Sequence, residues 1–288
     1  MKIIKDINSV RRNILFAKSR GKKIGFVPTM GYLHEGHASL LRQCKKENDI
    51  SVLSVFVNPK QFGPNEDFKE YPRDYKKDEL LAKKEKVDII FHPSIKEMYP
   101  DERSEPSGYL TSVEVERLGN CLCGKSRPGH FKGVTTVVAK LLNIVSPDVL
   151  YLGQKDAQQV VIIRTMMEDL NFPSNVKVLA TVREKDGLAM SSRNRYLTPL
   201  ERKEAPILFQ ALRSAKEKIL DGERNPDRII EMIRSMISKN SNGRIDYIEC
   251  LKAKTLEPMI ALSGEVLIAL AVWFNQTRLI DNILVRSQ

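Results

Sequence analysis

One stretch near the start of the chain constrains the fold more than any other. Residues 24–27, after Lys23, form a short apolar run of strand type, which Pro28 and Gly31 interrupt. After Gly36, apolar residues recur at helical spacing as far as Cys44. The stretch therefore predicts a strand, a turn and a helix in direct succession.

The turn carries two histidines, His34 and His37, at the expected start of the helix. Backbone N–H groups there lack partners and carry a partial positive charge, which makes the position suitable for phosphate. Imidazoles can donate hydrogen bonds to phosphoryl oxygens, and Gly31 and Gly36 allow the backbone to approach a ligand closely. Two other interpretations are a metal pair and ordinary surface histidines. The spacing of three residues across a glycine differs from the i, i+4 spacing of zinc-protease helices.

Composition limits the class of protein. A chain of 288 residues with 42% hydrophobic content can bury a full core and is long enough for two domains. No apolar run approaches the roughly 20 residues needed to cross a bilayer, and residues 1–6 lack the apolar core of a signal peptide. The four cysteines suit a reducing compartment, so we expect a cytoplasmic protein.

The net charge of +11 raises the question of nucleic-acid binding. The basic residues are, however, spread along the chain and mixed with acidic ones, as in residues 83–86. This pattern favours a solvated, lysine-rich surface that attracts acidic substrates such as ATP and small carboxylates.

Strands and helices alternate through the first part of the chain. We expect helices at 6–20 and 74–86 and strands at 50–57 and 88–91, with a long polar loop at 60–73 of the kind that binds ligands. Such alternation predicts an α/β fold with a Rossmann-like, doubly wound parallel sheet, and ligand bound at the carboxyl ends of its strands.

The second half begins with a basic, glycine-rich loop at 124–133, which includes Arg127 and His130 and leads into a helix expected at 134–145. A strand at 148–152 ends at a second polar strand-to-helix junction, and a strand at 176–182 follows. The alternation stops there, so we predict a first domain at 1–182 and a smaller α+β domain at 183–288. The second domain should contain helices at 199–220 and 226–239 and strands at 245–251, 266–273 and 279–284.

Three separate turns supply donors for a triphosphate. They carry His34 and His37, then Lys155, and then Arg193 with Ser191 and Ser192. Several positive donors acting together are what carboxylate activation by ATP needs, because charge develops on the α-phosphorus. Arg127 and His130 could join them.

The residues in this turn, His34-Glu35-Gly36-His37, resemble the signature of the nucleotidylyltransferase and class I aminoacyl-tRNA synthetase superfamily. Met190-Ser191-Ser192-Arg193 is similar to the mobile loop that closes on ATP phosphates in that superfamily. The chain as a whole resembles pantothenate synthetase through motifs at 28–37, 57–64, 71–73, 127–134, 153–159 and 190–194. One difference is Gln154, where the family usually has Glu.

The resemblance implies an ATP-dependent ligase of coenzyme A biosynthesis. It would join (R)-pantoate to β-alanine through pantoyl adenylate and release AMP and diphosphate. His37 would donate a proton; Gln61 and Gln159 would hold pantoate, and Gln61 would also lie near β-alanine. Mg²⁺ would accompany ATP, with Asp156 as a neighbour, and the family is usually homodimeric. The implied ATP contacts are Met30, Gly31, Tyr32, Leu33, His34, Glu35, Gly36, His37, Gly153, Gln154, Lys155, Asp156, Val182, Met190, Ser191, Ser192 and Arg193.

Two alternatives remain open from the sequence. A nucleotidylyltransferase acting on a phosphate ester would share the histidine turn, but it would not need Gln61, Gln159 or the loop at 60–73. A nucleic-acid-binding protein is the other alternative, although the chain carries no evident anticodon-binding module. We therefore expect small-molecule substrates, with neither nucleic acid nor membrane as a partner.

Overall fold

The computed structural model describes residues 1–64, 66–100 and 110–287. These residues divide into two compact units. The sheet unit comprises Met1–Asn120, Gly124–Gly153 and Ile162–Leu179, and the C-terminal unit comprises Cys121–Cys123, Gln154–Val161 and Ala180–Gln288.

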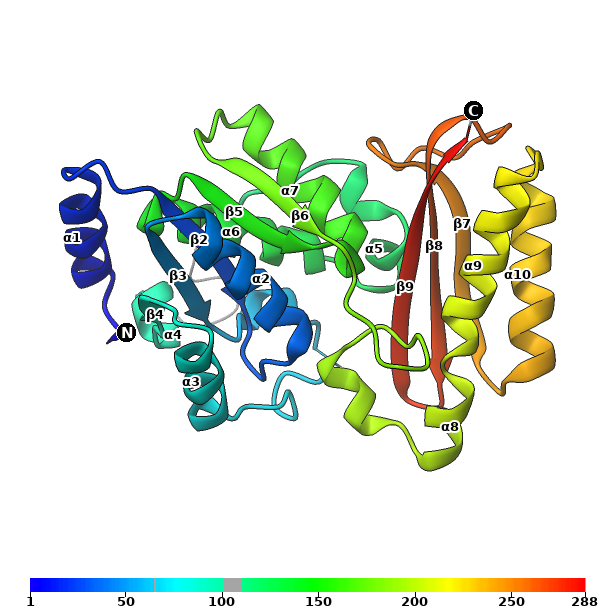
Figure 1. The fold of residues 1–288 in the computed structure, drawn as a ribbon, viewed down its shortest axis with the longest axis horizontal. Helices are drawn as coiled ribbons and strands as arrows, with labels where there is room; N and C mark the ends of the chain where they lie inside the picture. The colour runs from blue at the N-terminus through cyan, green and yellow to red at the C-terminus, as the bar shows by residue number, and fades with distance from the viewer. Residues whose placement is uncertain (65, 101–109, 288) are drawn as a thin grey trace. The chain divides into compact units, whose positions relative to one another are not determined.

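The sheet unit is built on six strands that all run parallel (Figure 1). Their order in space is β1-β4-β3-β2-β5-β6. The central strands are buried along most of their length, as expected for a sheet covered on both faces. The strands are β1 (Lys2–Ile4), β2 (Ile24–Thr29), β3 (Ile50–Val55), β4 (Ile89–Phe91), β5 (Val149–Gly153) and β6 (Asn175–Leu179).

The strand order reverses between β2 and β5. From β2 the chain moves outward to β3 and β4, whereas β5 and β6 lie on the opposite side of β2. Ligands of such sheets bind at the carboxyl ends of the strands where this reversal occurs. The histidine turn follows β2 directly, and Gly153 ends β5, so both expected ligand segments begin at this point of the sheet.

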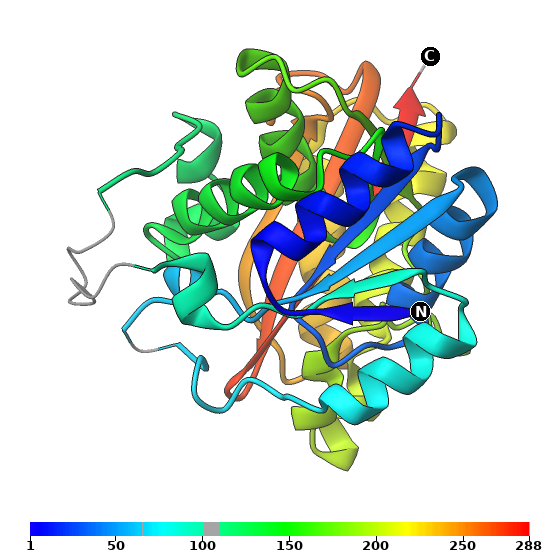
Figure 2. The same ribbon diagram turned by 90° about the vertical axis from the view of Figure 1, so that its left-hand side faces the viewer.

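Helices cover both faces of the sheet (Figure 2). Helix α2 (Glu35–Glu47) packs on β2, β3 and β5 and contacts α3 (Tyr75–Lys84). Helix α1 (Ile7–Lys18) contacts α6 (His130–Val145) on the other face. The remaining helical segments before residue 180 are α4 (Ile95–Met98), α5 (Cys123–Ser126), α7 (Ala157–Asp169) and the 3₁₀ turns η1 (Pro59–Gln61), η2 (Leu118–Asn120) and η3 (Gln154–Asp156).

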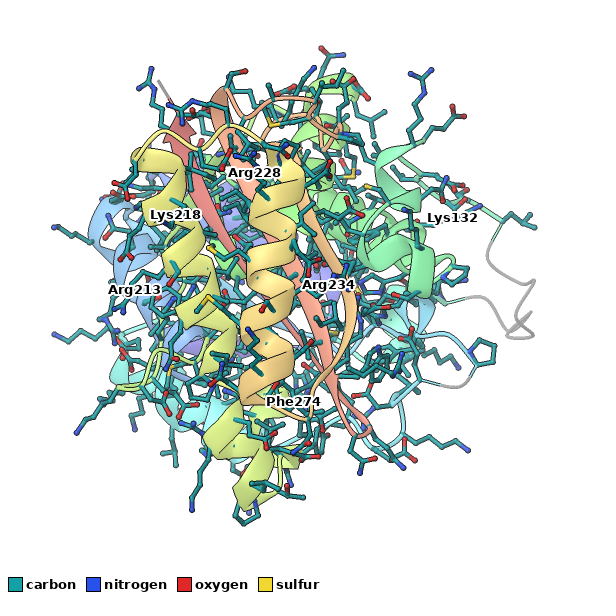
Figure 3. The ribbon with its side chains drawn as sticks, turned by 90° about the vertical axis from the view of Figure 1, so that its right-hand side faces the viewer. Lys132, Arg213, Lys218, Arg228, Arg234 and Phe274 are labelled. Atoms are coloured by element: carbon teal, nitrogen blue, oxygen red, sulfur yellow. The ribbon has the colours of Figure 1, made fainter. Side chains whose placement is uncertain are left out.

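The C-terminal unit contains an antiparallel sheet of β7 (Arg244–Lys252), β8 (Gly264–Phe274) and β9 (Thr277–Ser287). Alternate residues of β8, from Val266 to Phe274, enter a core shared with α9 (Ile207–Leu220) and α10 (Pro226–Asn240). Figure 3 shows these two helices side by side against the sheet. The unit also contains η4 (Ser192–Tyr196) and α8 (Pro199–Glu204).

Charged side chains lie on the outer faces of α9 and α10, as Figure 3 shows for Arg213, Arg228 and Arg234. Their side chains are 65%, 75% and 50% exposed and pair with glutamates nearby. This part of the basic charge therefore forms the expected solvated, mixed-charge surface.

The predicted α/β architecture is confirmed, but several element boundaries were wrong. The expected helix at 199–220 is two helices, because Pro206 lacks the N–H that would continue α8. Helix α6 starts at His130 and not at 134, since Gly129 adopts a left-handed conformation and begins it.

Pro28 was expected to interrupt the first strand, yet it lies within β2. The backbone of Thr29 faces β3, where its carbonyl accepts from Phe56, and the carbonyl of Ile24 faces the β5 side. By alternation Pro28 also faces the β5 side, where pairing stops at Phe26. Its missing N–H therefore removes no bond of the ladder.

No helix in the described part of the chain is long and apolar enough to span a membrane. The cysteines form no disulfide among the residues described. Burial raises the pKa of the Cys44 and Cys250 thiols to about 12. These two side chains behave as small core residues.

Candidate active site

The two histidines after β2 cap the helix that carries them. His34 is the N-cap of α2, and its Nδ1 accepts a hydrogen bond from the Gly36 N–H at 3.1 Å. In return, Nδ1 of His37 accepts from the His34 N–H at 3.2 Å. The ring centroids are 4.1 Å apart. The pair therefore uses imidazoles in the reciprocal arrangement that Ser and Glu usually provide at a helix start.

This capping decides which ring nitrogen can donate. A nitrogen that accepts a hydrogen bond carries no proton, so each neutral imidazole holds its proton on Nε2. Both rings are thus in the tautomer that can donate from Nε2, at the positive end of the α2 dipole. The arrangement suits an anion with several oxygens.

Gln61 lies close to the same turn. Its side chain is buried, at 7% exposure, and its Nε2 donates to the sulfur of Met30 at 3.0 Å. Asn58 donates to Gln61 Oε1 at 3.2 Å, and Tyr99 donates to Asn58 Oδ1 at 2.8 Å. The structure therefore brings Gln61 and Met30 together within the sheet unit and orients the glutamine amide.

Arg127 and His130 hold the backbone that carries Gln61. His130 Nδ1 lies 2.8 Å from the Gln61 carbonyl oxygen, and Arg127 donates to the same oxygen at 3.4 Å. Arg127 also forms an ion pair with Glu66 at 2.5 Å. Burial by itself would raise the pKa of Glu66, but Arg127 outweighs it and the pKa is lowered. In this structure both expected loop donors are engaged with the loop at 60–73.

Lys155 belongs to η3, the turn after β5, and strand β9 fixes its backbone. Asn282, which is 5% exposed, donates to the carbonyl oxygens of Gln154 and Lys155 at 3.0 and 2.8 Å. Lys155 Nζ lies 3.3 Å from the carboxylate of Asp156, whose side chain is 47% exposed. Gln159 follows on the first turn of α7.

Val182 and Met190 meet across a short hairpin in the C-terminal unit. The N–H of Met190 donates to the Val182 carbonyl at 3.0 Å, and Arg183 bridges to Ala189. Ser191 caps η4 by accepting from the Arg193 N–H at 3.2 Å. Hydrogen bonds therefore hold the backbone at both ends of the segment 190–193.

A sequence model of the pantoate-beta-alanine ligase family matches residues 2–284. The chain belongs to that family. Pantothenate synthetase from Caldicellulosiruptor saccharolyticus is 52% identical over 285 residues, which cover 99% of each chain. The enzyme from Acetivibrio thermocellus is 53% identical over 285 residues, again 99% of each.

Solved structures agree with this assignment. Pantothenate synthetase from Thermus thermophilus superposes with a TM-score of 0.91 at 40% identity, covering 98% of this chain and 99% of its own. The pantoate-beta-alanine ligase from Francisella tularensis, complexed with beta-gamma ATP and beta-alanine, gives a TM-score of 0.78 at 36% identity, covering 99% and 97%. As a member of the pantoate–β-alanine ligase family, the chain is a ligase that joins pantoate to β-alanine.

Two residues of this ligase that the sequence did not single out lie side by side on β9. Asp281, 3% exposed, forms an ion pair with Arg183 through contacts of 2.6 and 2.9 Å. Its neighbour Asn282 holds the Lys155 segment. The signal in the sequence was a polar pair inside an otherwise apolar strand, which a buried strand tolerates only when both groups are satisfied.

Gln154, the departure from the usual Glu of the ligase family, has a specific partner. Its Nε2 donates to Asn282 Oδ1 at 3.1 Å, while the Asn282 amide donates back to the Gln154 carbonyl. A carboxylate has no proton to donate at neutral pH, so Glu at this position would require Asn282 to present its amide instead.

Proposed function

We propose that this ligase first uses ATP to convert (R)-pantoate to pantoyl adenylate. The pantoate carboxylate attacks the α-phosphorus, and diphosphate leaves. The amine of β-alanine then attacks the acyl carbon, which forms the amide bond of pantothenate and releases AMP. The Francisella tularensis structure with a nucleotide and β-alanine supports both substrates.

The reciprocal capping of His34 and His37 is the observation that carries this proposal. It fixes two Nε2 donors at the start of α2, where charge on phosphate is also favoured by the helix dipole. Donors held in place before the reaction stabilise the developing charge without reorganisation. We assign His37 as the proton donor, with His34, Lys155 and Arg193 stabilising phosphoryl charge.

We assign the ATP contacts to Met30–His37, Gly153–Asp156, Val182 and Met190–Arg193. Gln61 and Gln159 hold pantoate, and Gln61 also lies near β-alanine. A glutamine amide binds a carboxylate and hydroxyls without neutralising the nucleophile, as a guanidinium would. The fixed orientation of the Gln61 amide supports its role.

Mg²⁺ would neutralise part of the triphosphate charge. The residues described here contain no group of three His, Cys, Asp or Glu side chains that could hold a metal ion. This fits an ion bound mainly through ATP oxygens and water, with Asp156 as a neighbouring carboxylate. We also propose that the ligase is a cytoplasmic homodimer, that residues 1–182 and 183–288 form its domains, and that the second domain excludes water from the mixed anhydride.

The test separates the two steps. Protein, ATP and Mg²⁺ are mixed with pantoate alone, and then with β-alanine added, while AMP, diphosphate and pantothenate are measured. Pantoate alone should support exchange of labelled diphosphate into ATP, and β-alanine should be needed for steady AMP release. AMP release that depends on β-alanine but without any diphosphate exchange would contradict the adenylate.

Variants test the residue roles. His37→Ala and Lys155→Ala should each lower kcat by at least about 10²-fold, the scale of losing one preorganised donor. Lys83→Ala, an exposed position on α3, is the matched control and should keep the wild-type rate. Folded His37 and Lys155 variants with near-normal rates would refute these assignments.

A further inference from the structure

Asp78 is a buried carboxylate directed at the backbone just before the two histidines. It lies on α3, a helix of mostly charged residues, yet it is only 2% exposed. Its Oδ2 accepts from the Tyr32 N–H at 2.9 Å, and its Oδ1 accepts from the Leu33 N–H at 2.6 Å. Each oxygen thus has a backbone donor from consecutive residues.

The backbone that Asp78 binds is in an uncommon conformation. Gly31 and Tyr32 have φ of +83° and +52°, so two successive residues lie in the left-handed region. Such a conformation is disfavoured for tyrosine and persists only where its surroundings stabilise it. Successive N–H groups in such turns form a concave site for an anion, which the Asp78 carboxylate fills.

The absence of a side chain at residue 31 leaves room for the carboxylate. A Cβ on Gly31 would lie 2.8 Å from Asp78 Oδ2, so glycine is what allows the approach. Lys77, the preceding residue on α3, places its Nζ 5.6 Å from the centre of the Tyr32 ring. Two adjacent side chains near the start of α3, Lys77 and Asp78, therefore interact with the turn.

The contact is one residue away from the capping histidines. Leu33 directly precedes His34, the N-cap, and His34 in turn is hydrogen-bonded to His37 through its own N–H. Burial raises the pKa of Asp78, whereas the two N–H groups act against this shift. The two N–H groups are charge-assisted donors, which are shorter and stronger than neutral ones.

We propose that Asp78 is a positioning residue for adenylation, which sets the backbone of residues 31–33 and thereby aims the Nε2 donors of His34 and His37. The proposal depends on the proposed function, since it assigns those donors to the phosphoryl group. Asp78 itself touches no substrate and acts only through the histidine turn.

The experiment compares Asp78→Asn with Glu79→Gln, a change at the neighbouring acidic residue on α3 that, unlike Asp78, is not buried. Pantoate-dependent exchange of labelled diphosphate into ATP reports adenylation alone. We expect Asp78→Asn to lower kcat for exchange by 10- to 100-fold with less than a threefold change in KM for ATP, because the loss is in transition-state alignment. Glu79→Gln should match the wild type.

A double-mutant cycle separates positioning from general damage. In a His34→Ala/His37→Ala background, Asp78→Asn should cost less than about threefold, since the groups it aims are already gone. If Asp78→Asn still lowers kcat for exchange by 10- to 100-fold in that background, the proposal is overturned. A wild-type exchange rate for folded Asp78→Asn overturns it as well. Loss of exchange by the wild type would instead refute the proposed function.

A second measurement applies if Asp78→Asn does not fold. Amide hydrogen exchange on the wild-type protein should show Tyr32 and Leu33 protected to the same degree as the first turn of α2. Rapid exchange at both amides would mean that the carboxylate does not hold the turn, and the proposal would be wrong.

Discussion

Gly133 offers the sharpest test of how the Gln61 segment is held. It lies inside α6, where the helix passes directly over the backbone of η1. A Cβ at Gly133 would lie 2.2 Å from the Lys60 carbonyl oxygen and 2.7 Å from the Cα of Gln61. Both are backbone atoms, so no side-chain rotation can relieve the overlap.

The substitution Gly133→Ala has two opposing effects on the free energy of unfolding. Alanine in the interior of a helix is favoured over glycine by about 1 kcal/mol. Ordinary contact begins at 3.4 Å, so the two backbones must separate by about 1.2 Å. Overpacking of this kind costs about 1–3 kcal/mol, and we place it at the upper end because backbone must move. We expect a net loss of about 2 kcal/mol in unfolding free energy.

The same displacement should impair catalysis. A misplacement of about 1 Å in a group that positions substrate can cost about 10²-fold in rate. Gly133→Ala should therefore lower kcat/KM for pantoate by about that factor, with a smaller effect on KM for ATP. Urea unfolding and steady-state kinetics on the same preparation measure both quantities.

Gly119→Ala is the control. Its Cβ would be 3.7 Å from Phe131 Cβ, an ordinary contact, so stability should stay within about 0.5 kcal/mol and kinetics should match the wild type. If Gly133→Ala is instead about 1 kcal/mol more stable than the wild type, with unchanged kcat/KM for pantoate, then α6 does not press on η1 and the reasoning fails.

Three further predictions concern charge. Hydrogen bonds from Lys177 and Tyr151 lower the pKa of Glu47 to about 2. The Glu47 carboxylate therefore contributes fully to the free energy of unfolding above its unfolded pKa of 4.5, and this contribution is lost as the pH falls toward 2. Because Lys177 is 41% exposed, we expect Glu47→Gln to reduce the loss of unfolding free energy between pH 6 and 2.5 by only about 1–2 kcal/mol. If urea unfolding at several pH values gave the same pH dependence for the variant and the wild type, this prediction would be contradicted. Glu66→Gln removes the partner of Arg127 and should raise KM for pantoate about fivefold, whereas Asp49→Asn, in an exposed ion pair with Lys22, should not. EDTA should abolish activity reversibly without shifting the thermal midpoint of the ligand-free protein, and a lowered midpoint would indicate a structural metal instead.

Local pattern was enough to predict much of the sheet unit. Its central strands are mostly buried runs rich in Val, Ile and Leu, and the helices expected at 6–20 and 74–86 begin directly after the N-caps Asp6 and Asp74. Strand β1 has only three residues, two of them exposed, so it has no pattern that distinguishes it from a disordered end. It is ordered because it pairs with β4, which local pattern cannot show.

The residues that support the site were harder to predict than those expected to contact ligand. The histidine turn has a distinctive local sequence, and so does the segment at 190–193. Asp78, Asp281 and Asn282 are ordinary polar residues whose roles depend on distant backbone groups. Tyr75, Asp78 and Ala82 do share one helical face, which would have placed Asp78 toward the core. Its partners could still not be named without the fold.

The bond between Asn282 and the Lys155 carbonyl has a consequence for synthesis. The two residues are 127 positions apart, so Lys155 emerges from the ribosome long before the strand that holds it has been made. A nascent chain that has completed its parallel sheet would still have a loose η3. Competence to handle ATP would then appear late, when β9 joins its neighbours, and not gradually as the chain grows.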